Sequence, residues 1–371
     1  MKTVLVLGGG FAGCVMAYFL KKKGFEVKLF EASSGLGGGC RTFFYHGHPY
    51  TFGPHHLLVP TTKMYLLDFF SEFLTMRRIH HYMMTHVESD GEFYSYPPHI
   101  DDIVGMPDYE QIQKELDTRN LTKKVDNFHD YWIASIGETL YNKYINNYSK
   151  KMWKIKNNKE IDSIGAITGI DSAVQTGSKE RFIGKYEIFY PVQLDGYNSL
   201  FEKCTKDCEI FLNTKVAKFD LESKSVFLNN GEVFSGDIII NTISLDSVFD
   251  YCYGELRYIG RDFQKIILPT EQVLPDPYHF VHYPGDGEDF TRIVEYKKMT
   301  GYQSKHTLIG IETPSFNNKL YPYQTKVEVE RHKKYNALTP KDCYHLGRMA
   351  TYRYIDMATL VDDCMQLIKE L

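Results

Sequence analysis

The stretch that decides the fold is at the start of the chain, where residues 1–42 read MKTVLVLGGGFAGCVMAYFLKKKGFEVKLFEASSGLGGGCRT. Residues 2–7 form a short β-branched apolar run, which is typical of a buried parallel strand. Residues 8–13 satisfy the pattern G-x-G-x-x-G, and a helix is expected to follow them. A second strand, residues 25–30, ends at Glu31. Strand, glycines, helix, strand and acid in this order predict a Rossmann-like dinucleotide-binding unit.

The three glycines of the G-x-G-x-x-G pattern each have a physical task in such a unit. Gly8 permits the tight turn, Gly10 lets the backbone approach a pyrophosphate, and Gly13 allows the helix to pack closely on the strand. Phe11 and Ala12 lie where the helix begins, and its free N–H groups and positive dipole would face the pyrophosphate. The acid that ends the second strand, eighteen residues after Gly13, is placed to bind a ribose 2′-hydroxyl.

A second glycine cluster indicates which dinucleotide binds. Residues 32–42 read ASSGLGGGCRT and contain Gly38, Gly39 and Arg41. This cluster resembles the extended motif of flavin enzymes related to amine oxidases, where it runs beneath the FAD, and NAD dehydrogenases generally lack it. A flexible surface loop is the alternative interpretation. The resemblance implies FAD as the cofactor.

Composition excludes several classes of protein. The 371 residues are 43% hydrophobic and 24% charged, so the chain can bury a core and is not wholly disordered. A net charge of −4 without a basic arm argues against nucleic acid as a partner. The seven cysteines are odd in number and include no CxxC pair, which is typical of reduced thiols in the cytoplasm. The apolar residues 3–20 contain four glycines and precede their positive charges, so we expect neither a signal peptide nor membrane insertion.

The remainder of the chain predicts two insertions into the dinucleotide domain. Residues 64–165 lack strand alternation and suggest helices at 64–73 and 129–153. Residues 209–212 and 225–228 suggest a hairpin arm, and 255–325 suggest antiparallel strands. Further expected elements are a buried parallel strand at 237–242, a strand near Tyr344 and a last helix from about 356 to 371.

The expected fold class is therefore α/β, a discontinuous Rossmann-like FAD-binding domain with a helical insertion and an antiparallel β-sheet domain. The boundaries we predict are 1–63, 190–246 and 334–371 for the FAD-binding domain, 64–165 for the helical insertion, and 166–189 with 247–333 for the antiparallel sheet that faces the substrate.

Five motifs, in the right order and with suitable spacing, resemble those of the UDP-galactopyranose mutase family. The motifs as they stand here are Phe52-Gly53-Pro54-His55, Tyr148-Ser149-Lys150-Lys151-Met152-Trp153, Phe290-Thr291-Arg292-Ile293-Val294-Glu295-Tyr296-Lys297, Tyr321-Pro322, and Gly347-Arg348 with Tyr352-Arg353-Tyr354-Ile355-Asp356-Met357. The resemblance extends along nearly the whole chain and is thin between about residues 154 and 185.

The resemblance assigns roles to residues of these motifs. Arg292 would bind the substrate pyrophosphate through its forked donors, and Tyr321 and Tyr354 would bond phosphate oxygens. The catalytic residues that the resemblance implies are His55, Arg292, Tyr321 and Tyr354. The nucleotide and sugar pocket would be lined by Tyr148, Trp153 and Tyr186, and the flavin side by Arg348, Asp356 and Met357. Simpler alternatives are a solvated Arg292, a Tyr354 that only packs, and an Asp356 that caps the last helix.

The chemistry implied by the resemblance is an isomerisation. Such mutases interconvert the pyranose and furanose forms of a nucleotide-diphosphate sugar, with N5 of reduced FAD as nucleophile on the anomeric carbon and no net redox change. The partner would be a nucleotide sugar, and the family resemblance suggests a homodimer.

The sequence departs from the family pattern in the substrate half and around the flavin face. The family carries a pyrophosphate-binding arginine on a mobile loop, and the corresponding stretch here, 169–175 (GIDSAVQ), has none. Lys179, Arg181 and Lys185 are candidate replacements. The second histidine of the Gly-Pro-His-x-x-His pattern falls on Leu58. Gly39 stands where Asn is expected, and Glu187 where Gln is usual. The sugar or the nucleotide base can therefore differ from galactose and uracil.

Three other interpretations remain open at the level of sequence. His46, His48, His55 and His56 crowd together, but no acidic or cysteine ligand lies among them, so we predict no metal site. An FAD-dependent amine oxidase or desaturase would share the glycine-rich start and would need an apolar tunnel. A non-catalytic flavin-binding protein would have lost the phosphate-binding residues.

Overall fold

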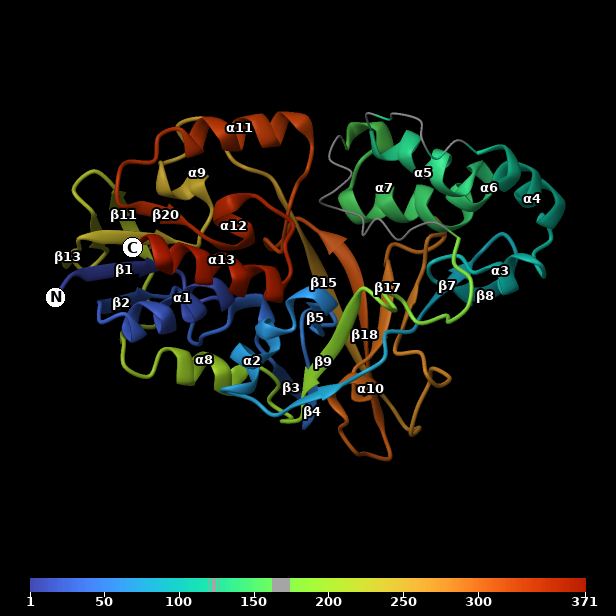
Figure 1. Ribbon diagram of the computed structural model, residues 1–371, viewed down its shortest axis with the longest axis horizontal. Coiled ribbons are helices and arrows are strands. Elements are labelled where there is room, and N and C mark those ends of the chain that lie inside the picture. The colour runs from blue at the N-terminus through green and yellow to red at the C-terminus, as the bar shows by residue number, and fades with distance from the viewer. Residues whose placement is uncertain (120, 122–124, 126, 162–173) are drawn as a thin grey trace.

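The chain begins with the predicted strand–helix–strand unit. Strands β1 (Thr3–Leu7) and β2 (Glu26–Phe30) pair in parallel, and α1 (Phe11–Lys22) connects them. The structure, a computed structural model, describes residues 1–119, 121, 125, 127–161 and 174–371 (Figure 1).

This unit belongs to a five-stranded parallel sheet of order β10-β2-β1-β14-β20. The other strands are β10 (Glu209–Phe211), β14 (Ile238–Asn241) and β20 (Cys343–His345). Because these strands come from segments far apart in the sequence, the Rossmann-like domain is discontinuous, as predicted. The sheet occupies the left of Figure 1, and both chain termini lie beside it.

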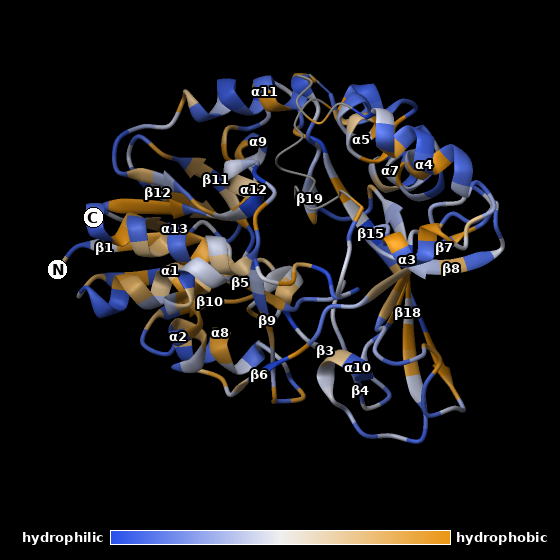
Figure 2. Cartoon of the chain, turned by 45° about the vertical axis from the view of Figure 1, so that its right-hand side comes forward, coloured by the Kyte–Doolittle hydropathy of each residue, from blue (hydrophilic) through white to orange (hydrophobic). Residues whose placement is uncertain are grey.

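Alternating side chains of β1 bury both faces of the sheet. Val4 and Val6 pack against α1, α8 (Asn198–Cys204) and α13 (Met357–Glu370). Leu5 and Leu7 pack against a three-stranded antiparallel sheet, formed by β11 (Val216–Asp220), β12 (Ser225–Leu228) and β13 (Val233–Ser235). Burial on two sides explains why the strand sequence is continuously apolar. Figure 2 shows β12 hydrophobic and the outer helices α4 and α11 mostly hydrophilic.

The predicted hairpin arm is wrong. Residues 209–211 pair in parallel with β2, whereas 225–228 pair with β11 and β13. Both segments are short and apolar, so their local pattern indicates a strand but does not name its partner.

The second large sheet has seven strands in the order β19-β15-β18-β17-β16-β7-β8. Its strands are β7 (Met83–Val87), β8 (Glu92–Ser95), β15 (Tyr258–Leu268), β16 (Phe280–His282), β17 (Arg292–Glu295), β18 (Thr307–Ser315) and β19 (Tyr321–Pro322). Neighbours are antiparallel except the parallel pair β16–β7. The expectation of antiparallel strands over 255–325 is confirmed.

The expectation that residues 64–165 lack strands is wrong. Besides β7 and β8, this range contains β6 (Met76–Arg78), which joins β5 (Leu57–Pro60) and β9 (Tyr186–Pro191) in a three-stranded sheet. The sequence of β7, residues 83–87 (MMTHV), shows little alternation of polar and apolar side chains, because most of this strand is buried. A strand buried on both faces resembles a helix segment in its composition. The domain boundaries themselves stay predictions.

The expected helix over 129–153 is broken into shorter pieces. These are α5 (Phe128–Ile136), α6 (Glu138–Tyr141), a π-helical turn (Asn142–Asn146) and α7 (Asn147–Trp153). Gly137 has φ 81° and ψ 167°, a backbone conformation that favours glycine, and it ends α5 and turns the chain. The pieces gather at the upper right of Figure 1 with α4 (Tyr109–Thr118), beside α3 (Ile100–Ile103).

The remaining elements cover edges and connect the sheets. They are β3 (Phe43–Tyr45), β4 (His48–Tyr50), α2 (Tyr65–Ser71), α9 (Leu245–Val248), α10 (Lys297–Thr300), α11 (Lys326–Asn336), α12 (Gly347–Thr351) and 3₁₀ turns at Gly38–Cys40, Thr61–Lys63 and Asn158–Glu160. Among the described residues, the helices are too short or too polar to cross a bilayer.

Candidate active site

A cavity of about 540 Å³ lies where the helices, the seven-stranded sheet and the Rossmann-like domain meet. One wall comes from α5 and α7, another from β15–β17 and β19, and the third from residues 52–56 with α12 and the start of α13. The predicted residues that line it are His55, Tyr148, Trp153, Tyr186, Arg292, Tyr321, Arg348, Tyr354, Asp356 and Met357. The fold therefore brings together residues from all five sequence motifs.

Arg292 is held by a carboxylate on the next strand. Arg292 on β17 lies opposite Glu312 on β18 in the strand register. The guanidinium donates from Nε and Nη2 to one oxygen of Glu312, at 2.9 and 2.5 Å, and Glu312 is fully buried. Burial alone would lower the pKa of Arg292, but Glu312 outweighs it and raises that pKa above its ordinary value. Arg292 is thus a fixed cation on the cavity wall, and the alternative of a solvated strand face is wrong.

Tyr321 and Tyr354 form a stacked pair beneath a second arginine. Their ring centroids are 5.3 Å apart with an interplanar angle of 15°, and the Arg348 guanidinium lies 5.0 and 5.1 Å from them. Burial opposes ionisation of Tyr321, yet Arg261, Arg292 and Arg348 together lower the pKa of its phenol. The pKa of Tyr354 is raised by burial and by its neighbour Tyr321. Two phenol donors therefore face a strongly positive wall.

The helical wall of the cavity is aromatic. Tyr148 lies 4.9 Å from the His282 ring, centroid to centroid, and burial raises the pKa of Tyr148 to about 12. Trp153 is buried near Tyr323, and Phe128 and Trp132 complete this wall. Flat apolar faces of this kind suit a planar base.

The third wall of the cavity contains a neutral histidine and a helix cap. Burial and the nearby Arg348 lower the pKa of His55 to about 4, so the imidazole is uncharged at neutral pH. Asp356 caps α13 by accepting the N–H of Thr359 at 2.7 Å, which confirms the capping interpretation, and it also lines the cavity. The ring of Tyr186 lies 5.2 Å from that of Phe182, centroid to centroid, and also lines the cavity.

The glycine turn has the shape that a dinucleotide needs. A Cβ on Gly13 would lie 1.9 Å from the Gly8 carbonyl oxygen, so only glycine permits the close packing of α1 on β1. Gly10 faces open space, where a Cβ would meet nothing within 4 Å. Gly8 has φ +97° at the turn. These residues fit a bound pyrophosphate at the start of α1, the task predicted for them.

Glu31 and the second glycine cluster close around the turn. Glu31 accepts the backbone N–H of Gly9 at 2.8 Å and of Ser33 at 2.7 Å. Each carboxylate oxygen keeps a lone pair, so binding of a ribose hydroxyl remains open to it. Gly37 donates to the Gly9 carbonyl at 2.8 Å, which places Gly38 and Gly39 beside the turn.

The other residues predicted to bind the cofactor also surround the turn. Ala12 is buried against the start of α12, where a Cβ on Gly347 would lie 2.9 Å from the Ala12 Cβ. Phe11 packs on Phe70, and Arg41 lies over Phe43 at 4.7 Å. The residues present therefore fit FAD, and the role of each stays a prediction.

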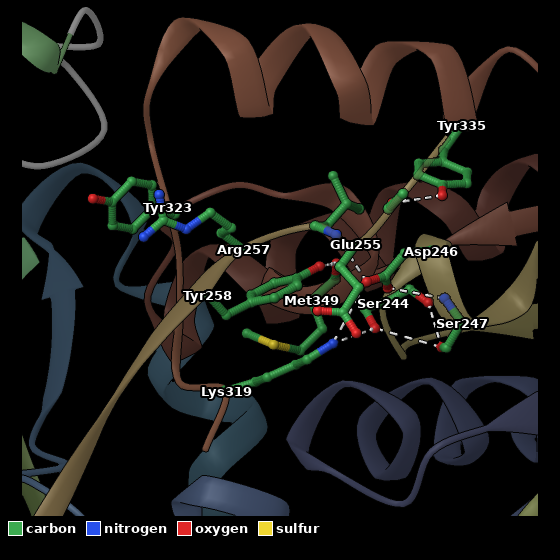
Figure 3. Close-up of polar contacts among 12 residues, drawn as sticks. Ser244, Asp246, Ser247, Glu255, Arg257, Tyr258, Lys319, Tyr323, Tyr335 and Met349 are labelled. Carbon is green, nitrogen blue, oxygen red and sulfur yellow. Dashed lines mark hydrogen bonds and ion pairs between the residues drawn. The ribbon is translucent and has the colours of Figure 1, made fainter. Parts of the chain in front are cut away.

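A polar network joins the seven-stranded sheet to this domain (Figure 3). Asp246, fully buried after β14, lies 3.6 Å from Lys319 in the segment before β19. Lys319 also donates to Ser244 at 3.3 Å, and Tyr258 donates to the Met349 carbonyl at 2.8 Å. These contacts connect β15 and the segment before β19 to the residues that follow β14 and to α12.

The family model described as UDP-galactopyranose mutase matches residues 143–354, which is more than half of the chain. The chain belongs to the UDP-galactopyranose mutase family. A model of NAD(P)-binding Rossmann-like domains matches residues 6–73. The predicted family, the fold class and the enzyme class, an isomerase, are thereby confirmed.

Individual members of the mutase family match over nearly their whole length. The dTDP-fucopyranose mutase of Escherichia coli is 24% identical over 99% of this chain and 97% of its own. The UDP-galactopyranose mutase of Mycoplasma genitalium is 25% identical over 95% of this chain and 91% of its own. A crystal structure of reduced UDP-galactopyranose mutase superimposes with a TM-score of 0.81, covering 100% of this chain and 93% of that chain at 15% identity.

The structure places several of the residues at which the sequence departs from the family pattern. Residues 169–173 of the stretch without the loop arginine lie outside the described residues. Of the candidate replacements, Lys179 is ion-paired with Asp102 at 2.6 Å, whereas Arg181 lines the cavity. Leu58 lines the cavity as well, and Glu187 pairs with Arg78 at 2.5 Å.

Sequence reasoning missed two charged residues of the site, Arg261 and Glu312. Arg261 also lines the cavity, and its Nε lies 3.8 Å from Glu312. One signal was present: Glu312 ends the apolar run TLIGIE of a predicted strand, and a carboxylate in a buried strand requires a cation. Among the described residues no cluster of three or more His, Cys, Asp or Glu side chains is arranged to hold a metal ion.

Proposed function

We propose that the chain interconverts the pyranose and furanose forms of a nucleoside-diphosphate sugar, with FAD as cofactor. The observation that carries the proposal is the group of two arginines and two stacked tyrosines that line one cavity: Arg292, Arg348, Tyr321 and Tyr354. A diphosphate is the ligand that such forked donors and phenols suit. The family match covers these four residues.

The chain's own residues bind and orient in this reaction. Arg292, held by Glu312, and the phenol of Tyr321 hold the diphosphate both before and after it leaves the sugar. Retention of the leaving group lets it attack again at the end of the cycle. Tyr148 and Trp153 pack against the base. When bound in its reduced form, FAD supplies through N5 the nucleophile for the anomeric carbon, with no net redox change.

The named activities of the relatives support a class of substrate for this chain. One relative is a dTDP-fucopyranose mutase and another a UDP-galactopyranose mutase. We therefore propose a pyrimidine nucleoside diphosphate carrying a hexose or deoxyhexose. A homodimer, predicted from the family resemblance, belongs to the same proposal.

An amine oxidase or desaturase is less well supported. Such an enzyme needs an apolar tunnel, whereas four arginines line this cavity: Arg181, Arg261, Arg292 and Arg348. A non-catalytic flavin protein is also less well supported, because the Arg292–Glu312 pair and the tyrosine stack are intact.

The test uses purified protein whose flavin is identified by absorbance. The flavin is reduced with dithionite, and UDP-, dTDP-, GDP- and CDP-sugars are screened for pyranose-to-furanose conversion by HPLC. Conversion only with reduced flavin is the expected result. Bound FAD without conversion of any sugar, together with oxygen-dependent turnover of an amine or alkene, would show that the protein is an oxidase and not a mutase. Light scattering of the same sample tests the dimer.

A further inference from the structure

Arg261 is a buried arginine in the candidate active site that the sequence motifs do not contain. It lies on β15, its side chain is 2% exposed, and it lines the cavity. Strand β18 separates β15 from β17, so Glu312 on β18 stands between Arg261 and Arg292. One carboxylate oxygen of Glu312 lies 2.5 Å from Arg292 Nη2 and 3.8 Å from Arg261 Nε. The two guanidiniums are therefore close neighbours on one wall.

The donors of Arg261 are poorly used within the protein. Nη1 donates to the Gly260 carbonyl at 2.9 Å, and Nη2 contacts the sulfur of Met152, a weak acceptor. Its Nε has no hydrogen-bond partner among the described residues, because 3.8 Å is too long for a hydrogen bond. A buried cation whose donors are unsatisfied is unfavourable unless a ligand completes its bonds.

The charge balance of the cavity shows what kind of ligand that is. Four guanidiniums line it, and among the described residues the carboxylates that line the cavity or contact these groups are those of Asp356 and Glu312. The Tyr321 ring lies between Arg261 at 5.2 Å and Arg348 at 5.0 Å. The cavity is thus positive around Tyr321 and fits a multiply charged anion.

We propose that Arg261 is a second diphosphate-binding residue, which Glu312 holds beside Arg292 so that each guanidinium binds one phosphate group. This inference rests on the proposed function, since it assumes that a nucleoside diphosphate enters the cavity. It assigns to a fixed strand residue the second cation of the diphosphate site, for which the stretch 169–175 offers no arginine.

Arg181 is the rival for the same task. Its guanidinium lies over the rings of Phe182 at 4.2 Å and Tyr96 at 5.2 Å, and Nη1 contacts Met83 at 3.4 Å. It shares no carboxylate with Arg292 among the described residues, whereas Arg261 does. We therefore place Arg181 away from the phosphate pair and include it in the test.

The test compares nucleotides with one and two phosphates on FAD-loaded protein. Dissociation constants of UDP and UMP, or of dTDP and dTMP if these bind more tightly, are measured by titration calorimetry. Wild type is expected to prefer the diphosphate by at least about tenfold, a common effect of one charge-assisted contact pair. In Arg261→Met the diphosphate is expected to bind at most about threefold more tightly than the monophosphate, while the affinity for the monophosphate changes little. Arg261→Lys keeps the charge without the fork and is expected to lie between the two.

Arg257→Met is the matched control. Arg257 lies just before β15, is exposed, and is directed at Tyr323, 4.3 Å from its ring (Figure 3). Its removal is expected to leave both nucleotide affinities unchanged. Melting curves of each variant check that Arg261→Met and Arg261→Lys fold.

Three outcomes would overturn the assignment. Arg261→Met and Arg261→Lys could both keep the wild-type preference for the diphosphate. Arg181→Met could lose the preference instead. Arg261→Met could lose mono- and diphosphate equally, which is a structural effect. Wild-type protein that binds neither nucleotide contradicts the proposed function itself, and that result is distinct from the other three.

Discussion

The phenol rings of Tyr321 and Tyr354, thirty-three residues apart in the chain, stack at 5.3 Å under the guanidinium of Arg348. Tyr321 comes from β19 at the edge of the seven-stranded sheet, and Tyr354 follows α12 of the Rossmann-like domain. The stack therefore joins the sheet that would bind the substrate to the domain that would bind FAD.

Arg292→Lys is expected to lower kcat/KM by about a hundredfold. A lysine cannot bond Glu312 through two nitrogens and keep a further donor for a phosphate. Steady-state kinetics with reduced enzyme measures the change. Arg78→Lys, at an exposed ion pair with Glu187, is the control and should leave kcat/KM unchanged. An Arg292→Lys enzyme with wild-type kcat/KM contradicts the role of the fork.

The lowered pKa of Tyr321 predicts that the affinity for a diphosphate falls at alkaline pH. The pKa of Tyr321 is lowered, since three arginines outweigh its burial, so the phenol ionises below its usual pKa of about 10. Ionisation removes a donor and adds a negative charge beside the diphosphate. Affinity should therefore fall as pH rises through that pKa. In Tyr321→Phe the affinity at neutral pH drops and this alkaline fall disappears. Calorimetry from pH 7 to 10 measures both, and an unchanged profile in Tyr321→Phe would assign the fall to another group.

An added methyl group is expected to weaken FAD binding at Gly10 and to destabilise the folded protein at Gly13. Gly10→Ala faces open space and should change the free energy of unfolding of the apoprotein by less than about 0.5 kcal/mol, yet weaken FAD binding. Gly13→Ala places Cβ against the Gly8 carbonyl and should destabilise the apoprotein by about 1–3 kcal/mol. Urea unfolding and flavin titration separate the two effects. Full FAD affinity in Gly10→Ala would show that the pyrophosphate does not approach this residue.

Asp356 is expected to contribute to stability as the cap of α13 and to activity through its carboxylate. Two substitutions separate these contributions. Asp356→Ala removes the cap of α13 and is expected to lower the free energy of unfolding by about 0.5–2 kcal/mol. Asp356→Asn preserves the capping acceptor and should be close to wild type in stability. Any loss of activity in Asp356→Asn then reports the carboxylate that is missing from the cavity. Equal destabilisation of both variants contradicts the capping role.

Buried neutral histidines predict a loss of stability in mild acid. Burial, mainly, lowers the folded-state pKa of His55 to about 4 and of His279 to about 3, below the unfolded value of about 6.5. Below pH 6.5 the unfolded chain takes up protons that the folded chain does not. Stability is therefore complete above pH 6.5 and falls between pH 6.5 and 4, by about 1.4 kcal/mol per pH unit for each such histidine. Urea unfolding at several pH values should show a shallower fall in His279→Gln. The exposed His46→Gln is the control, and equal slopes in both variants would point to other groups.

Most of the Rossmann-like domain was predictable because its signals are local. The strand, glycine turn and helix of residues 2–22 follow from the backbone that each residue permits, and the structure reproduces them within one residue. The family motifs also placed Arg292, Tyr321 and Tyr354 in one site. Strand pairing was less predictable. Residues 83–87 and 209–211 carry apolar patterns that fit several partners, and only the assembled sheets decide among them.

The sequence by itself therefore determined the dinucleotide-binding unit, the family and the residues of the five motifs, because each depends on short-range spacing. Only the tertiary structure decided that Glu312 stands between Arg261 and Arg292, fifty-one residues from the first and twenty from the second. That arrangement depends on the order in which β15, β18 and β17 lie side by side. Strand order results from burial of whole faces, and no short stretch of sequence encodes it.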